Sequence, residues 1–309
     1  MAQQRRKGLN VRCRRNLNTQ CMQWVKQSED GPRIAVIILT LNEAANLGRC
    51  LDSVCGLAAE VIVVDSGSTD ATIDIAKSYG ATVIFHEFKN QAHQFNWALD
   101  NLEGDSKWIL RLDADEYLLP ELRDEIVSRL RDAPDDVCGY LMKRRMIFLG
   151  RWIRHGGYYP TWLLRLFRHG HARSELSEMD EHIVLHRGKT ARLQNDFVDQ
   201  NRKGLSDWCL KHERYASRQA RVIVGCVGAT DPAGLKARFF GNQIERKRWF
   251  KNNVYRRAPL FSRAFAYFLY RYFVRLGILD GREGLIFHYL HAAWYLFYVD
   301  AKIYEMRKK

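Results

Sequence analysis

The sequence lacks the glycine patterns that mark two large classes of nucleotide-binding enzyme. No Gly-x-Gly-x-x-Gly motif follows the first strand-like run, and Ile38–Glu43 contains no glycine. A dinucleotide-dependent oxidoreductase uses that motif to bring its backbone close to a pyrophosphate. Sugar nucleotidyltransferases typically carry a glycine-rich phosphate loop in the same N-terminal place. The absence of glycine argues against both classes.

Cysteine is also too scattered to define a framework. The chain has seven cysteines, an odd number, and none forms a Cys-x-x-Cys pair. Neither a disulfide scaffold nor a zinc site is therefore indicated. We expect reduced thiols in a cytosolic protein.

Long apolar runs are missing as well. Residues 1–32 carry a cluster of Arg and Lys without an apolar core, so we predict a flexible basic segment and no signal peptide. The most apolar stretch, Leu285–Val299, has fifteen residues, whereas a helix needs about 20 to cross a bilayer. We expect no membrane-spanning helix.

The charge balance is strongly basic. Lys and Arg number 49 against 35 Asp and Glu, a formal net charge of +14 over 309 residues. Such an excess attracts an anionic partner: a nucleic acid, a nucleotide or an acidic membrane surface.

Residues 33–115 alternate between two hydrophobic patterns. Short apolar runs typical of buried parallel strands are separated by segments with helical spacing. This alternation predicts an α/β sheet with flanking helices and right-handed crossovers. The expected strands are Ile34–Leu39, Val61–Val64, Ala81–Phe85 and Trp108–Leu112, and the expected helices are Glu43–Val54, Ala71–Tyr79 and Gln91–Leu102.

Downstream of residue 115 the alternation is looser. Pro120 begins a predicted helix, Glu121–Leu130, at a position where proline is tolerated. Val137–Leu149 and Thr161–Arg168 are predicted strands, and Leu205–Val222 is a predicted amphipathic helix.

Polar clusters follow three of the predicted strands. They are Thr40–Glu43, Asp65–Asp70 and Asp113–Asp115. The carboxyl ends of parallel strands meet at one crevice, so these side chains are expected to converge. Each cluster alone is explained equally well as a helix cap or a turn. Three in this order favour a shared binding site.

Carboxylates in such a crevice suit a metal–nucleotide complex. Mg²⁺ and Mn²⁺ prefer oxygen ligands and bridge protein to diphosphate, and the metal neutralises charge on a departing diphosphate. Asp115 is the expected metal ligand, and Asp113 can reach the metal or a ribose. Asp65 can accept a hydrogen bond from a base N–H, and Glu43 can bind a ribose hydroxyl.

The three clusters resemble the nucleotide-sugar-binding motifs of family-two glycosyltransferases of the GT-A fold. The resemblance covers roughly residues 33–120 and implies a Rossmann-like, mixed, mainly parallel sheet within a catalytic domain at 33–228. It implies inverting transfer from a nucleoside diphosphate sugar, with UDP the expected nucleotide and Mg²⁺ or Mn²⁺ the cofactor. The implied donor-binding residues are Thr40, Asn42, Glu43, Asp65 and Gly67, with Asp113 and Asp115 at the ribose and metal.

An inverting transferase needs a general base for the acceptor hydroxyl. The segment Met179–Ile183 resembles the Glu-His-Ile segment of bacterial lipopolysaccharide-core glucosyltransferases. We predict Glu181 first and Asp180 second as the base, with His182 supporting them or binding phosphate. A surface acidic turn is the alternative.

The C-terminal region, 229–309, combines cations and aromatic rings. Lys236 to Arg275 holds eleven Lys or Arg, twelve aromatics and one acid, Glu245. Such segments can lie in a membrane interface. A soluble helical subdomain that packs its rings internally is the alternative. A nucleic-acid surface has the charge but no recognition motif, so no nucleic acid is expected.

This region also resembles the tails of bacterial polysaccharide and lipopolysaccharide glycosyltransferases. The resemblance implies a saccharide or lipid-linked acceptor and peripheral attachment to the anionic cytoplasmic face of the inner membrane. A sugar nucleotidyltransferase, or a non-enzymatic module that binds membrane or nucleic acid, is the alternative function.

Three further groups are weaker candidates. The segment His155–Pro160 is either a mobile acceptor loop or a plain turn. Arg165 and Arg168 either pair with phosphate or are solvated strand charges. The helix-borne set of Lys211, His212, Arg214 and Tyr215 is by default a helix surface.

Overall fold

The N-terminal half alternates strands and helices as predicted. A computed structural model describes residues 32–176, 181–225, 237–241 and 243–308. Pro120 occupies the first turn of α4, and the side chain of Asn90 caps α3 by accepting from the His93 N–H at 2.8 Å. The elements of this half are β1 (Ile34–Thr40), α1 (Ala44–Val54), β2 (Glu60–Asp65), α2 (Thr72–Ser78), β3 (Thr82–Phe85), α3 (Gln91–Asp100), β4 (Trp108–Asp113), β5 (Glu116–Leu118) and α4 (Pro120–Arg131).

The second half adds strands of both directions to the same sheet. They include β6 (Val137–Phe148), β7 (Arg151–Trp152), β8 (Thr161–Arg168) and β11 (Lys189–Asp199). The order is β3-β2-β1-β4-β8-β6-β11-β5, with β7 paired to β6. Strands β1 to β4, β6 and β11 run one way, and β5, β7 and β8 run the other. The predicted mixed, mainly parallel sheet with flanking helices is confirmed.

Both faces of the sheet are covered, which explains the unbroken apolar run of β1. Ile34, Val36 and Ile38 pack with α1, α2 and α4. Ala35 and Ile37 face the opposite layer, formed by α3 and by β9 (Ala172–Ser174) and β10 (Ile183–Leu185). All five β1 side chains are fully buried, so the core lies on both sides of β1.

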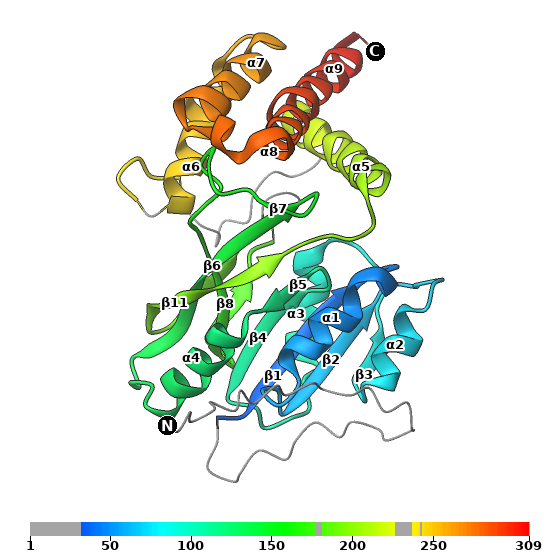
Figure 1. The fold of residues 1–309 in the computed structure, drawn as a ribbon, viewed down its shortest axis with the longest axis vertical. Coiled ribbons are helices and arrows are strands. Elements are labelled where there is room, and N and C mark those ends of the chain that lie inside the picture. The colour runs from blue at the N-terminus through cyan, green and yellow to red at the C-terminus, as the bar shows by residue number, and fades with distance from the viewer. Residues whose placement is uncertain (1–31, 177–180, 226–236, 242, 309) are drawn as a thin grey trace, which may run out of the picture.

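Helices gather at one end of the sheet (Figure 1). α5 (Leu205–Val224) lies against α9 (Tyr295–Lys308), with Ala216 and Ala220 packed on Val299 and Ile303. The other elements there are α6 (Gln243–Asn253), η1 (Tyr255–Arg257), α7 (Ser262–Leu269), η2 (Tyr270–Val274), η3 (Gly277–Asp280), α8 (Gly281–His288) and η4 (Tyr289–Trp294). Within the described residues, no helix combines the length and apolar character required to span a bilayer.

The segment after β7 is fastened to these helices. The carboxylate of Asp280 accepts from the backbone N–H of His155 at 2.9 Å and lies 2.6 Å from its Nδ1. The Arg271 Nε donates to the Gly156 carbonyl at 2.8 Å, and the Gly156 N–H donates to the Arg275 carbonyl at 2.9 Å. Gly156 has φ +65°, and a Cβ there would meet the His288 ring at 2.0 Å. Of the two predictions for His155–Pro160, the structure favours an anchored turn.

Buried histidines in the helical layer predict a loss of stability in mild acid. Burial lowers the pKa of His212 and of His288 to about 4 and holds that of His291 well below its usual range. In the unfolded chain each histidine takes up a proton near pH 6.5. The stabilisation is therefore complete above about pH 6.5 and is lost as pH falls towards 4, at roughly 1.4 kcal/mol per pH unit for each histidine.

Urea unfolding followed by tryptophan fluorescence between pH 7.5 and about 4.5 measures this loss. Trp208 stacks on His212 with ring centroids 3.5 Å apart, so its emission reports on that site. The variant His212→Gln should show a shallower decline in the free energy of unfolding. An unchanged slope in this variant would show that His212 does not contribute.

Candidate active site

Strand register brings the three polar clusters together. In the parallel pairing of β1 with β2, Thr40 lies opposite Asp65. In the pairing of β1 with β4, Leu39 lies opposite Asp113. The clusters that follow these strands consequently share one edge of the sheet, as expected from the sequence.

Asp65 is buried, and both of its carboxylate oxygens accept hydrogen bonds from neighbouring residues. Its Oδ2 accepts from the backbone N–H groups of Gly67 and Ser68, both at 2.8 Å. Its Oδ1 accepts from the Thr40 hydroxyl at 2.9 Å and the Ser68 hydroxyl at 2.5 Å. Gly67 holds φ +97°, a conformation suited to glycine. Asp65 shapes this turn, and its hydrogen bond to a base stays a prediction.

Asn42 joins the first cluster to the second. Its backbone N–H donates to the Ser68 hydroxyl at 2.8 Å, and its Oδ1 accepts from the Thr69 N–H at 2.8 Å. Asn42 holds φ +54°, which asparagine tolerates better than most residues. Thr40, Asn42 and Gly67 thus build the frame of the site.

Glu43 is held by two donors, one from the neighbouring turn and one from a distant part of the chain. Its Oε2 accepts from Asn46 at 2.8 Å and its Oε1 from the Lys203 ammonium at 2.6 Å. Burial raises the pKa of Glu43, the hydrogen bonds from Asn46 and Lys203 oppose this, and the Asp115 charge adds to the rise. The buried Asn46 also accepts from the Arg202 N–H at 2.9 Å. The segment after β11 therefore closes one side of the site.

Asp113 belongs to a buried ion cluster. Arg165 reaches its Oδ2 at 3.3 Å and Arg111 its Oδ1 at 3.5 Å. Burial would raise the pKa of Asp113, but these two guanidiniums hold it well below its usual range. Arg165 also donates to Glu116 at 2.5 Å, and Glu116 accepts from the Asp113 N–H at 2.9 Å. Arg165 is thus a buried partner of carboxylates and not a solvated strand charge.

Arg168, the other strand arginine, lies elsewhere. It donates to the carbonyls of Val137 and Pro134 at 3.1 and 3.2 Å and covers the Trp108 ring. These contacts place it at the opposite end of β8 from the polar clusters.

Asp115 differs from the other three acids of the site. No hydrogen bond engages its carboxylate within the part of the chain that the structure describes, and the Lys211 ammonium lies 4.0 Å from its Oδ2. Burial would lower the pKa of Lys211, but Asp115, Tyr215, Glu43 and Asp199 raise it above its usual range. A protonated lysine therefore faces a carboxylate with free lone pairs.

Asp199 at the end of β11 faces the same group. Burial and the Asp115 charge raise the pKa of Asp199 to about 6, while Arg144 and Lys211 oppose the rise. Arg144 lies 3.4 Å from its Oδ2. Asp199, Glu116 and Lys203 were not assigned roles from the sequence. Asp199 could have been found by the pattern that identified the other clusters, an acid at the end of a strand followed by polar residues. It ends β11 and precedes Gln200 and Asn201.

The donor set fits a divalent cation shared with a ligand. Among the described residues no group of three His, Cys, Asp or Glu could enclose a metal ion. Mg²⁺ commonly uses only one or two carboxylates and takes its other ligands from phosphates and water. Asp115 has unengaged oxygens, and the contacts of Asp113 are long, so these two residues would hold such an ion.

Glu181 acts electrostatically on the same tyrosine, Tyr215, as two acids of this group. Burial raises the pKa of the Tyr215 hydroxyl, Lys211 opposes the rise, and Glu181, Asp113 and Asp115 add to it. Tyr215 therefore lies within electrostatic reach of all three carboxylates. Asp180 lies outside the described residues.

His182 contacts an acid outside the group formed by Asp113 and Asp115. Its Nδ1 lies 3.1 Å from the Glu175 Oε1. Glu175 in turn accepts from the Arg248 Nη1 at 3.0 Å. These contacts suit a supporting role for His182. Phosphate binding by His182 stays a prediction.

Comparison with known proteins identifies the family. The family model described as "Glycosyl transferase family 2" matches residues 35–194. The chain belongs to this family. Membership agrees with the predicted GT-A-type class, whose mixed, mainly parallel sheet with flanking helices is the architecture observed.

Two relatives illustrate the range of similarity. A Rhizobium meliloti lipopolysaccharide core biosynthesis glycosyltransferase, LpsC, is 30% identical over 198 residues, which cover 60% of this chain and 70% of that protein. An uncharacterized glycosyltransferase of Rickettsia bellii is 47% identical over 94 residues, which cover 30% of this chain. The match spans only 31% of that relative's length.

Solved structures of glycosyltransferases are similar in part. Glucosyl-3-phosphoglycerate synthase of Mycobacterium tuberculosis, in complex with Mn²⁺ and UDP-glucose, is 27% identical and covers 38% of this chain and 44% of its own, with a TM-score of 0.31. S. aureus TarS in complex with UDP-GlcNAc is 15% identical over 89% of this chain and 92% of its own, with a TM-score of 0.45.

Proposed function

We propose that this family-two protein is an inverting, metal-dependent glycosyltransferase that uses a UDP-sugar. The acceptor would be a saccharide or a lipid-linked saccharide of bacterial lipopolysaccharide or surface-polysaccharide synthesis, at the cytoplasmic face of the inner membrane. The observation that carries the proposal is the unengaged carboxylate of Asp115, beside Asp113 and Lys211, at the edge where the family's donor motifs meet. The relationship to a lipopolysaccharide core glycosyltransferase supports the acceptor class.

The chain's own groups divide the work between donor and acceptor. Glu43, held by Lys203, would accept from a ribose hydroxyl. Lys211 stays protonated and would attract the diphosphate. Bound Mg²⁺ or Mn²⁺, held by Asp115 and Asp113, would supply Lewis-acid stabilisation of the leaving diphosphate. Glu181 would accept the proton of the acceptor hydroxyl as that oxygen attacks the anomeric carbon and UDP departs.

Isothermal titration of the full chain with UDP tests the donor half of this proposal. We expect binding in the presence of Mn²⁺ and at least about tenfold weaker binding after chelation, because a metal held by Asp115 and Asp113 would add its attraction for the diphosphate. UDP-sugars should compete with UDP, and a panel of nucleotide sugars, read by hydrolysis or transfer, identifies the donor. The same heat with and without Mn²⁺ would refute metal dependence.

A further inference from the structure

Exposed apolar side chains are concentrated at the C-terminal end of this protein. Eighteen of the twenty-five large hydrophobic residues that the described structure exposes lie at or after Phe239. Many occupy α7, η2, η3, α8 and the start of η4, which pack on one another: the rings of Phe268 on α7 and Tyr289 on η4 lie 6.1 Å apart, and those of Phe268 and Tyr272 stack at 5.4 Å. A soluble protein rarely leaves so much apolar surface contiguous without a partner.

The most exposed part of this surface is residues 273–279, here named the apolar turn. Val274 is 69% exposed and Leu279 is 56% exposed. Phe273, Leu276 and Ile278 are each about half exposed. Leu276 also holds φ +60°, a left-handed conformation unfavourable for leucine. An exposed leucine in a strained conformation adds little to the stability of the fold. Contact of Leu276 with a binding partner therefore explains its presence better.

The charges around the apolar turn have one sign. Between Phe265 and Tyr289 the exposed charged residues are Arg275 and Arg282. Asp280 is buried against His155, and Glu283 is only partly exposed. Exposed aliphatic side chains suit the hydrocarbon boundary of a bilayer, and the neighbouring cations and tyrosines suit its anionic headgroup region. Nucleic acid would gain nothing from Val274 or Leu279, since neither stacks on bases.

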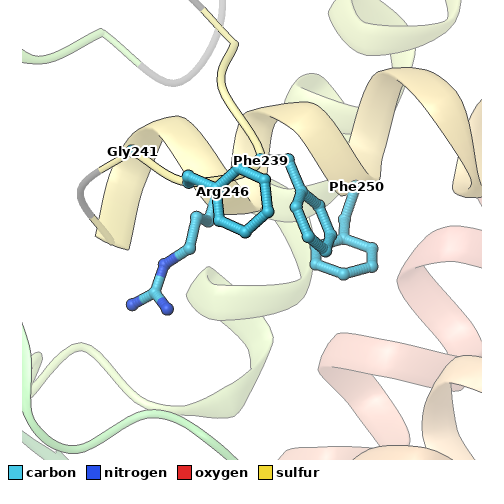
Figure 2. A pocket seen from close by; sticks show the side chains of 5 residues that line it. Phe239, Gly241, Arg246 and Phe250 are labelled. Carbon is cyan, nitrogen blue, oxygen red and sulfur yellow. The ribbon is translucent and has the colours of Figure 1, made fainter.

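A second basic and aromatic surface is formed by α6 and the residues just before it. Phe239 and Phe250 line a shallow hollow there with Arg246, and Figure 2 shows the two rings side by side while the guanidinium points away from them. Their ring centroids are 5.9 Å apart, and the adjacent Phe240 is 95% exposed. Like the apolar turn, this surface combines exposed apolar side chains with an arginine.

We propose that the apolar turn inserts shallowly into an anionic lipid bilayer, with Arg275 and Arg282 on lipid phosphates, as a monotopic anchor. Arg271, Arg275 and Asp280 bind the segment at His155 and Gly156, which fixes the turn to the sheet. The anchor therefore sets the orientation of the donor site relative to the lipid surface. Its purpose, delivery of a lipid-linked acceptor, rests on the proposed function, whereas bilayer binding itself does not.

Flotation of the full chain with vesicles tests the anchor. The vesicles are phosphatidylcholine alone, or phosphatidylcholine mixed equally with phosphatidylglycerol. We expect the protein to float with the anionic vesicles, and Val274→Asp/Leu279→Asp to weaken this binding at least about tenfold, because two inserted side chains are lost. Arg282→Gln should weaken binding to anionic vesicles about fivefold, at roughly 1 kcal/mol per cation, and leave neutral vesicles unaffected. Leu210→Asp is the matched control: it makes the same change at a 64% exposed site on α5 and should float like the unchanged protein.

Each outcome has a separate meaning when UDP titration and light scattering accompany flotation. Loss of flotation in the double variant with unchanged UDP binding supports the anchor. An unsubstituted protein that binds UDP but floats with neither vesicle overturns the anchor and leaves the proposed function standing. Flotation without any UDP binding removes the proposed function instead. A dimer that the double substitution dissociates, without flotation, would make the surface an interface between copies and overturn the anchor.

Discussion

Replacing Asp115 by alanine is expected to abolish Mn²⁺-dependent UDP binding and to reduce sugar transfer by about 10²-fold or more, the usual scale for loss of a group that stabilises developing charge. The physical reason is that Asp115 has a carboxylate without hydrogen bonds in the described structure, so its lone pairs are available to a cation. Its removal should leave the fold intact, since no hydrogen bond engages its carboxylate among the described residues and its ion-pair partner, Lys211, lies 4.0 Å away.

Asp136→Ala is the matched control for this substitution. Asp136 is an exposed carboxylate that forms an ion pair with Lys189. This ion pair lies where the parallel strands β6 and β11 begin, at the opposite end of β11 from Asp199. The control should retain UDP binding, and both variants should keep the unfolding midpoint of the unchanged protein. Full transfer by Asp115→Ala would reject the metal assignment.

Glu181→Gln is expected to separate donor binding from chemistry. The amide cannot take the acceptor's proton, so kcat should fall by about 10² to 10⁴-fold, while UDP titration with Mn²⁺ stays unchanged. The site around Tyr215 loses one negative charge but no donor ligand.

Glu213→Gln provides the comparison for Glu181→Gln. Glu213 is an exposed glutamate on α5, paired with Lys302 at 3.1 Å, and its variant should transfer normally. If Glu181→Gln remains active, Asp180→Asn becomes the decisive variant. Weakened UDP binding by Glu181→Gln would instead place Glu181 on the donor side.

Local sequence patterns were sufficient for the first half of the fold. The apolar run at Ile34–Leu39 and the helical spacing of Leu47, Leu51 and Val54 each satisfy a local propensity and a buried position at once. Observed elements there differ from the predicted bounds by one or two residues. The convergence of Asp65 and Asp113 followed from one general rule, that parallel strands share their carboxyl ends.

Non-local partners could not be obtained in this way. The sequence does not specify that β8 inserts between β4 and β6, and this insertion places Arg165 between Asp113 and Glu116. The Lys203–Glu43 pair joins residues 160 positions apart. Such contacts depend on strand order, whereas periodicity reports only which face of one element is buried.

The C-terminal region illustrates a different limit. Composition predicted helices with rings and cations, and the structure divides those groups between two environments. Phe287 and His288 pack inside, against Tyr158, while Phe240 and Phe273 are exposed. Amino-acid content alone cannot assign individual rings to core or surface. Membrane association itself stays a prediction.

The packing of α5 on α9 limits how far this enzyme can be shortened. The segment shared with the family ends at residue 194, before Asp199, Lys203 and Lys211. Lys211 sits on α5, and α5 rests on Val299 and Ile303 of the terminal helix. A fragment trimmed to the shared segment would keep Asp113 and Asp115 with Arg111 and Arg165, and would lose Asp199, Lys203 and Lys211 from the candidate site. The last helix and the complete candidate site are therefore expected to be retained or lost together, although residues 200 and 300 are far apart in the sequence.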